Sequence, residues 1–347
     1  LLRLEQNSEY DFGAADIGNF VHSVLDSLTE QLTVDGVFRS DISESELEQR
    51  AERIISDYIS RVCPENDRRS ARLLGLIRRI RRSVSLIASN ICREFEQSRF
   101  VPIAHEMQIK DNSPFNPSPL EFTLEQGAKL SIYGTLDRAD VYRRGDDVYV
   151  RVIDYKTGAK DFSMKDIEMG MNLQLMIYLF TVCAQSNVQF KQMLGCPEGG
   201  RLLPAGMLYY SASVADVNLT SPKSAEDVRK EAERALARKG LLTNDEAVLR
   251  AMEPELDGKY IAVTASEDKL KTGRGISLIG ADEFDALQKQ VGDVITSIAN
   301  ELCAGKVEAE PMVYGGVKSC AWCEMRAICR RYDNDGTASA ENADDAE

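Results

Sequence analysis

The chain of 347 residues is 43% hydrophobic and 28% charged, a balance typical of globular proteins, and it is long enough to bury a substantial core. It has no run of eighteen apolar residues, which argues against a membrane-spanning helix, and its eight scattered cysteines favour a reducing cytoplasm over a disulfide framework. The formal net charge of −14 argues at first sight against nucleic-acid binding, but the charge is unevenly distributed.

Apolar periodicity predicts helices and strands in the order of a mixed α/β fold. Helices are expected at residues 16–32, 43–61, 69–97, 172–184, 224–239 and 282–304, strands at 102–110 and 201–211, and a loop at 112–119. A β-hairpin is expected between these strands, with its turn at residues 144–147. This order predicts a mixed central sheet with helices on its faces.

The ends of the chain suggest its domain limits. It begins Leu1-Leu2-Arg3-Leu4 with no Met and no signal-peptide pattern, which favours a fragment of a longer chain. No internal repeat or linker is evident, so we expect one elaborated domain over residues 1–332. Residues 333–347 contain six acidic side chains and no Lys or Arg, which predicts a disordered acidic tail.

The third predicted helix is unusually rich in arginine. Seven arginines occur in the short stretch from Arg68 to Arg82, beside an apolar stripe at helical spacing. The pattern fits a solvated helix face as well as it fits a surface that contacts phosphates or a partner. The sequence leaves these two interpretations open.

The predicted hairpin carries the clearest chemical pattern. A four-residue loop pairs Arg143 with Val148 and, because the sum of paired numbers is constant along an antiparallel ladder, puts Asp137 opposite Asp154. Such side chains lie about 5 Å apart on one face of the sheet, and Lys156 projects from the same face. Two carboxylates this close repel each other, which favours a divalent cation between them. A solvated ladder of salt bridges fits the same parity.

Three further positions have more than one interpretation. Gln174 and Tyr178 are spaced i, i+4 on an apolar helix and point the same way, either to satisfy core groups or to face the carboxylates. His22 is one of two histidines, and a lone helical histidine is more often structural than a ligand. Glu106 fits a carboxylate near the site or an ordinary surface charge.

Three cysteines near the C-terminus form a second pattern. Cys320, Cys323 and Cys329 have the spacing C-x2-C-x5-C, which is typical of ligands to one soft metal centre. The other five cysteines show no paired spacing, so a fourth ligand is expected to lie outside this chain.

These segments together resemble the RecB-like branch of the PD-(D/E)XK nucleases, and within it the nuclease domains of the AddB family of helicase–nuclease subunits. The resemblance covers essentially all of residues 1–332. It rests on a G-x-x-x-H helix at residues 18–22, a G-x-x-D-R-x-D segment at 134–140, a D-Y-K-[ST]-G segment at 154–158, a Q-L-x-x-Y helix at 174–178 and an AddB-like stretch at 239–245. It implies a restriction-endonuclease-like fold, a mixed central sheet flanked by helices and carrying helical insertions.

The resemblance also implies a role for each candidate residue. Asp137, Asp154 and His22 would coordinate Mg²⁺ or Mn²⁺, and Lys156 would stabilise the attacking water and the charged phosphorane. Gln174 and Tyr178 would support the site. The three C-terminal cysteines would bind a [4Fe–4S] cluster with a fourth cysteine that in the family precedes an L-R-L segment. Because this chain begins at that segment, we expect the cluster to be incomplete in it.

The implied function is a DNA exonuclease that acts with an AddA-like subunit in the cytoplasm, with no membrane partner. The resemblance implies cleavage of the 5′-ended strand at double-strand breaks during recombinational repair, although polarity belongs to the assembly and not to these residues. Two alternatives remain. One is a free-standing RecB-like exonuclease, and the other is a non-catalytic DNA-binding scaffold of the same fold.

Overall fold

The computed structural model of the protein describes residues 14–36, 42–62, 71–156, 162–211, 235–266, 269–308, 311, 313–314 and 317–329. The chain divides into two compact units, Leu1–Ile295 and Thr296–Glu347. The predicted domain boundary at residue 332 and the predicted acidic tail both lie outside the described residues. Along the described part of the chain, no helix has the length and apolarity needed to cross a membrane.

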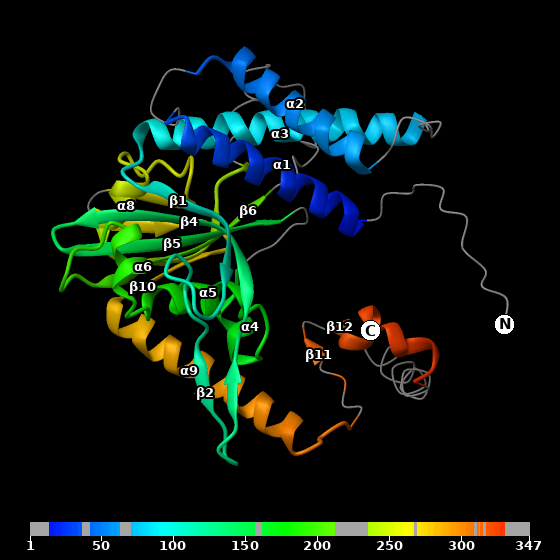
Figure 1. Ribbon diagram of the computed structural model, residues 1–347, viewed down its shortest axis with the longest axis vertical. Helices are drawn as coiled ribbons and strands as arrows, with labels where there is room; N and C mark the ends of the chain where they lie inside the picture. The colour runs from blue at the N-terminus through cyan, green and yellow to red at the C-terminus, as the bar shows by residue number, and fades with distance from the viewer. Residues whose placement is uncertain are drawn as a thin grey trace, which may run out of the picture. The chain divides into compact units, whose positions relative to one another are not determined.

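The first unit is built on a six-stranded mixed sheet in the order β1-β4-β5-β6-β7-β10 (Figure 1). Its strands are β1 (Val101–Ile109), β4 (Gly134–Arg144), β5 (Asp147–Lys156), β6 (Leu202–Ser211), β7 (Lys239–Thr243) and β10 (Ile276–Ile279). The pairs β1/β4, β4/β5 and β6/β7 are antiparallel, whereas β5/β6 and β7/β10 are parallel. The predicted mixed α/β fold is therefore confirmed.

Helices cover both faces of this sheet (Figure 1). One face is covered by α1 (Ala14–Val34), α2 (Glu44–Val62) and α3 (Ala71–Gln97), and α8 (Glu246–Met252) adds to the same core. The other face is covered by α5 (Gln174–Cys183), α6 (Val188–Met193) and the first part of α9 (Ala281–Cys303), with the short α4 (Met164–Glu168) nearby. The apolar stripes that predicted α1, α3 and α5 are the surfaces these helices bury.

Shorter elements complete the described chain. They are the hairpins β2 (Glu121–Thr123)/β3 (Lys129–Ser131) and β8 (Val263–Ser266)/β9 (Lys269–Thr272), and in the second unit β11 (Val313–Tyr314)/β12 (Val317–Lys318) with the 3-10 turns Ser319–Trp322 and Glu324–Ala327. The predicted helix at 224–239 lies mostly outside the described residues. Its predicted end is wrong, because Lys239 begins β7 and pairs with Tyr209 of β6.

The hairpin between β4 and β5 has the predicted register. Arg143 pairs with Val148, and the ladder continues to Arg138, which pairs with Ile153. The next pair in this register is Asp137 and Asp154. The observed ladder ends one step before this pair, so the position of Asp137 opposite Asp154 stays a prediction.

A buried charge network fastens α3 to the sheet. Glu94 of α3 lies 2.7 Å from Arg151 of β5 and also pairs with Arg238, while Arg151 and Arg138 both contact Asp140. All five side chains are 0% exposed. Burial alone would raise the pKa of Glu94, but the arginines around it hold the pKa below its usual value. The network fixes the position of α3 along β5.

Candidate active site

Two of the candidate residues lie at the end of β5. Asp154 is only 4% exposed, and the Nζ atom of Lys156 lies 2.6 Å from its Oδ2. Val148, Val150 and Val152 belong to the core under α5, so strand alternation turns Asp154 and Lys156 toward that same face. The residue between them, Tyr155, turns toward α1 and α3.

Asp137 lies where β4 changes the face it presents. Leu136 packs in the core under α5, but Arg138, two residues later, lies in the charge network beneath α3. Residues two apart in a regular strand face the same side, so the alternation is interrupted at Asp137. The neighbouring strand β1 changes face at the same level, at Glu106, whose φ of 46° is rare for a residue other than glycine. The Asp137 side chain itself is partly buried.

This position lets Asp137 contact α1 and β5 together. Its Oδ2 atom accepts a 2.8 Å hydrogen bond from the backbone N–H of Tyr155 and lies 3.3 Å from Nδ1 of His22 on α1. The His22 ring also packs edge-on against the Tyr155 ring, with centroids 6.1 Å apart. His22, which the residue pattern alone left as a structural histidine, thus lies directly beside the paired acids.

The charges around Asp137 and Asp154 favour the binding of a cation. Burial raises the pKa of Asp137, and the nearby charge of Asp154 raises it further, against the opposing effects of His22, the Tyr155 amide and Lys156. A cation between the two carboxylates would remove this repulsion. The two acids therefore have the chemistry of a divalent-ion site.

The fit of Asp137 and Asp154 to a divalent ion depends on how many protein ligands such an ion requires. No three His, Cys, Asp or Glu side chains among the described residues stand close enough to form a ready-made metal site. Mg²⁺, however, usually keeps several waters and binds through only one or two carboxylates. Asp137 and Asp154 provide two hard oxygen donors beside each other, and they fit an ion of this kind.

The helix α5 is fixed against the start of β4 by a close approach. Gln174 Nε2 donates a 3.2 Å hydrogen bond to the Tyr178 hydroxyl, which confirms that these two side chains point the same way. A side chain at Gly134 would overlap the Tyr178 ring, so glycine is required there. Gly134, the first residue of the G-x-x-D segment, thus lies against Tyr178, the last residue of the Q-L-x-x-Y motif.

The buried Asp26 near Asp137 was not predicted from the sequence, and the exposed Glu106 was left open. Asp26, one helical turn after His22, is 7% exposed. Burial raises its pKa to about 8, with smaller contributions from Asp137 and Glu106. Glu106 occupies the β1 position level with Asp137. The sequence signal that could have identified Asp26 was an acid on the apolar face of α1, between Leu25 and Leu28.

The three C-terminal cysteines lie in the second unit. Cys320 is in the first 3-10 turn, Cys323 precedes the second, and Cys329 follows it. All three are free thiols, and within the described residues their side chains do not form a group that holds a metal. The prediction that these cysteines belong to a cluster left incomplete in this chain stays a prediction.

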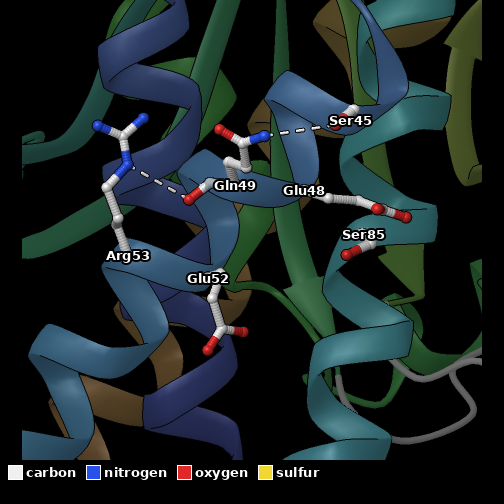
Figure 2. Close-up of a pocket in the computed structure, with 6 residues that line it drawn as sticks. All are labelled: Ser45, Glu48, Gln49, Glu52, Arg53 and Ser85. Carbon is white, nitrogen blue, oxygen red and sulfur yellow. Dashed lines mark hydrogen bonds between the residues drawn. The ribbon is translucent and has the colours of Figure 1, made fainter.

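Elsewhere on the surface, a hollow of about 560 Å³ lies between α2 and α3 (Figure 2). It is lined by Ser45, Glu48, Gln49, Glu52, Arg53 and Ser85. Only Ser85 among them is partly buried, and the polar contacts are local, as between Gln49 and Ser45. The hollow lacks the buried, mutually repelling charges found around Asp137.

Comparison with known proteins agrees with the geometry. The model of the PD-(D/E)XK nuclease superfamily matches residues 1–330. Similar proteins include the B subunits of the ATP-dependent helicase/deoxyribonucleases of Clostridioides difficile, 28% identical over 335 residues, and Acetivibrio thermocellus, 24% identical over 330 residues. Both alignments cover 95% of this chain but 28% of the relative, so the chain spans less than a third of their length.

The family match extends over nearly all of the chain, and the mixed sheet has the arrangement that this family requires. The chain belongs to the PD-(D/E)XK nuclease superfamily and is homologous to the C-terminal part of the AddB-type subunits of helicase/deoxyribonucleases.

Proposed function

We propose that the chain is a DNA-hydrolysing domain whose active site depends on Mg²⁺ or Mn²⁺ and is formed by Asp137, Asp154 and Lys156. The observation that carries the proposal is the meeting of two carboxylates and an amine at the end of β5, with one acid almost fully buried. Burial of like charges is costly for a protein, and it is typical of sites whose function requires them.

In this proposal Asp137 and Asp154 hold the ion, with His22 as a further ligand. When bound, the ion supplies an activated water and neutralises charge on the phosphate. The Tyr155 amide orients Asp137 through its 2.8 Å hydrogen bond. Because this donor belongs to the backbone, it does not itself titrate.

The remaining side chains act on the substrate. Lys156 carries a compact charge next to Asp154, suited to stabilising the negative charge that develops at phosphorus. Gln174 and Tyr178, joined to each other and packed on Gly134, would support the edge of the site on the α5 side. Each of these roles is compatible with hydrolysis of an unactivated phosphodiester.

We further propose that the domain works as an exonuclease within a larger cytoplasmic helicase–nuclease, with an AddA-like partner, and that it degrades the 5′-ended strand during recombinational repair of double-strand breaks. The support is that its relatives are named as subunits of an ATP-dependent helicase/deoxyribonuclease. The iron–sulfur cluster is not part of this proposal, because its fourth ligand is expected to lie outside this chain.

The decisive experiment is Mg²⁺-dependent cleavage of linear DNA by Asp154→Asn. We expect the rate to fall by at least about a hundredfold, because a buried charged ligand is lost while its shape is kept. Asp147→Asn is the matched control, since it removes the same charge from the opposite end of β5. Cleavage by Asp154→Asn at the parent rate would refute the proposal.

The same assay separates this function from a non-catalytic scaffold. A scaffold would bind DNA but show no metal-dependent cleavage above background in the parent protein. The ion pair between Lys156 and Asp154, with Asp137 close enough for its pKa to respond to both, favours the enzyme.

A further inference from the structure

We propose that Arg78 and Arg79 on α3 bind the phosphates of a DNA strand whose scissile bond lies at Asp154 and Lys156. This inference rests on the proposed nuclease function and adds a second contact region to it. It explains the arginine-rich stretch that the sequence left open between a solvated face and a binding surface.

The position of α3 follows from its contacts with the sheet. Glu94 lies against Arg151 in the middle of β5, whereas the Ile87 carbonyl and Asn90 accept hydrogen bonds from Tyr210, which pairs with Tyr155 near the end of β5. Descending residue numbers along α3 therefore follow β5 toward Asp154. The arrangement is visible in Figure 1, where α3 runs along the top of the sheet.

The first half of α3 consequently extends past the end of β5. Arg79 is eight residues before Ile87, which at 1.5 Å per residue is about 12 Å further along the helix. β5 ends at Lys156, one residue after Tyr155. Arg78 and Arg79 thus lie beyond the same end of β5 at which the candidate active site lies.

Both arginines are exposed and lack a local counter-charge. No acidic residue occurs in α3 before Glu94, so neither arginine has an acid three or four residues away on the helix. Within the described residues, no carboxylate pairs with either of them. Arg78 instead lies four residues from Arg82, and like charges at this spacing destabilise a helix.

Of the three arginines in this group whose side chains the structure describes, one is neutralised by the neighbouring helix. Arg81 lies 2.6 Å from Glu52 of α2, one of the acids that line the hollow between α2 and α3 (Figure 2). The other two, Arg78 and Arg79, keep their charge exposed.

A polyanionic strand is the occupant that matches this charge and this distance. Guanidinium groups bind phosphate through two parallel hydrogen bonds, which makes arginine the preferred residue for such contacts. The offset of about 12 Å corresponds to roughly three to four nucleotides at about 3.4 Å each. Because Asp154 faces the α5 side of the sheet and α3 covers the other side, a strand held at Arg78 and Arg79 would pass around the end of β5 to reach it.

The test compares Arg78→Gln/Arg79→Gln with Arg143→Gln/Arg201→Gln. The second pair is the matched control, because it removes the same charge at the opposite end of β5, where Arg143 pairs with Val148 and Arg201 precedes β6. Binding of a labelled single-stranded oligonucleotide is measured against salt concentration, with Asp154→Asn in every variant to prevent cleavage. Cleavage kinetics are then measured with Asp154 restored.

We expect the Arg78/Arg79 variant to bind several-fold more weakly, with a salt slope of log K reduced by about 1.4 for two lost phosphate contacts. Its KM should rise with kcat unchanged, whereas the control variant should match the parent. Unaltered DNA binding in the Arg78/Arg79 variant would overturn the inference, including the case in which these arginines bind a protein partner instead. A parent protein that binds DNA through these arginines but never cleaves it would refute the proposed function alone.

Discussion

At the scale of single residues, the surroundings of Asp137 hold more negative charge than a protein interior usually accepts. Asp26 is buried, carries a pKa raised to about 8 by burial and its acidic neighbours, and makes no hydrogen bond through its Oδ1 atom. An ordinary Asp titrates near 3.8, so the folded protein retains a proton on Asp26 that the unfolded chain has lost. This difference ties stability to pH.

We predict that Asp26→Asn stabilises the metal-free protein, and more so as the pH rises. The parent loses stability between about pH 4 and about pH 8, by up to about 1.4 kcal/mol per pH unit, because the unfolded chain binds fewer protons across this window. Asparagine has no proton to lose, so the variant should not show this slope. Urea unfolding in EDTA at several pH values measures the difference.

A difference in unfolding free energy between Asp26→Asn and the parent that does not change with pH would contradict this account. Asp35→Asn serves as the control, since Asp35 is an exposed acid just beyond the end of α1 and is expected to change stability little.

The residues of the site were predictable to the extent that they follow from regular geometry. Pairing arithmetic in a hairpin gave the observed register from Arg143 to Arg138, and it puts Asp137 level with Asp154 one step beyond the observed ladder. The change of face at Asp137 was not predictable, since it accompanies a positive φ at Glu106 that no local pattern encodes. The contact between Asp137 and His22 depends on that change.

At the scale of secondary-structure elements, a buried network decides where α3 lies. Arg138, Arg151 and Arg238 are opposed there by only two carboxylates, Glu94 and Asp140, so each acid is needed. Removing one partner from a buried ionic network leaves charge uncompensated, which costs far more than the pair itself contributes.

Glu94→Gln is therefore expected to destabilise the protein by about 3–5 kcal/mol, despite keeping the size of the side chain. Chemical denaturation measures the loss. Glu96→Gln, two residues away on the exposed side of the same helix, is expected to change stability by less than about 0.5 kcal/mol. Equal effects of the two substitutions would show that the buried network does not hold α3 in place.

Long amphipathic elements were predicted well and short ones were not. The predicted helices at 16–32, 43–61, 69–97 and 282–304 agree with α1, α2, α3 and α9 to within a few residues, because each has an apolar stripe over several turns. β7 and β10 have five and four residues, too few for a period to emerge. β10 also pairs in parallel with β7, and such a partner is fixed only by the tertiary fold.

At the scale of the whole molecule, the candidate site draws on residues from His22 to Tyr178, which no local pattern connects. The order of the strands brings these residues together, because β1, β4 and β5 are neighbours and α1 and α5 lie on opposite faces beside them. The order of the predicted elements along the chain could predict a mixed sheet but not the order of its strands. The resemblance to a known family supplied the connection between His22 and the two acids before the coordinates did.

The global stability of the protein should report the ion that this arrangement implies. We predict that Mn²⁺ raises the unfolding temperature of the parent, because a ligand that binds only the folded state adds RT ln(1 + [L]/Kd), or about 2.7 kcal/mol at a hundred times Kd. Asp137→Asn/Asp154→Asn should be at least as stable as the parent in EDTA, since the repulsion that raises the pKa of Asp137 is gone, and should gain nothing from Mn²⁺. Asp146→Asn/Asp147→Asn, which removes two adjacent acids from the far end of the same hairpin, should keep the full response. A Mn²⁺-dependent shift that survives in the Asp137/Asp154 variant would mean that the ion binds elsewhere, and the proposed active site would lose its metal.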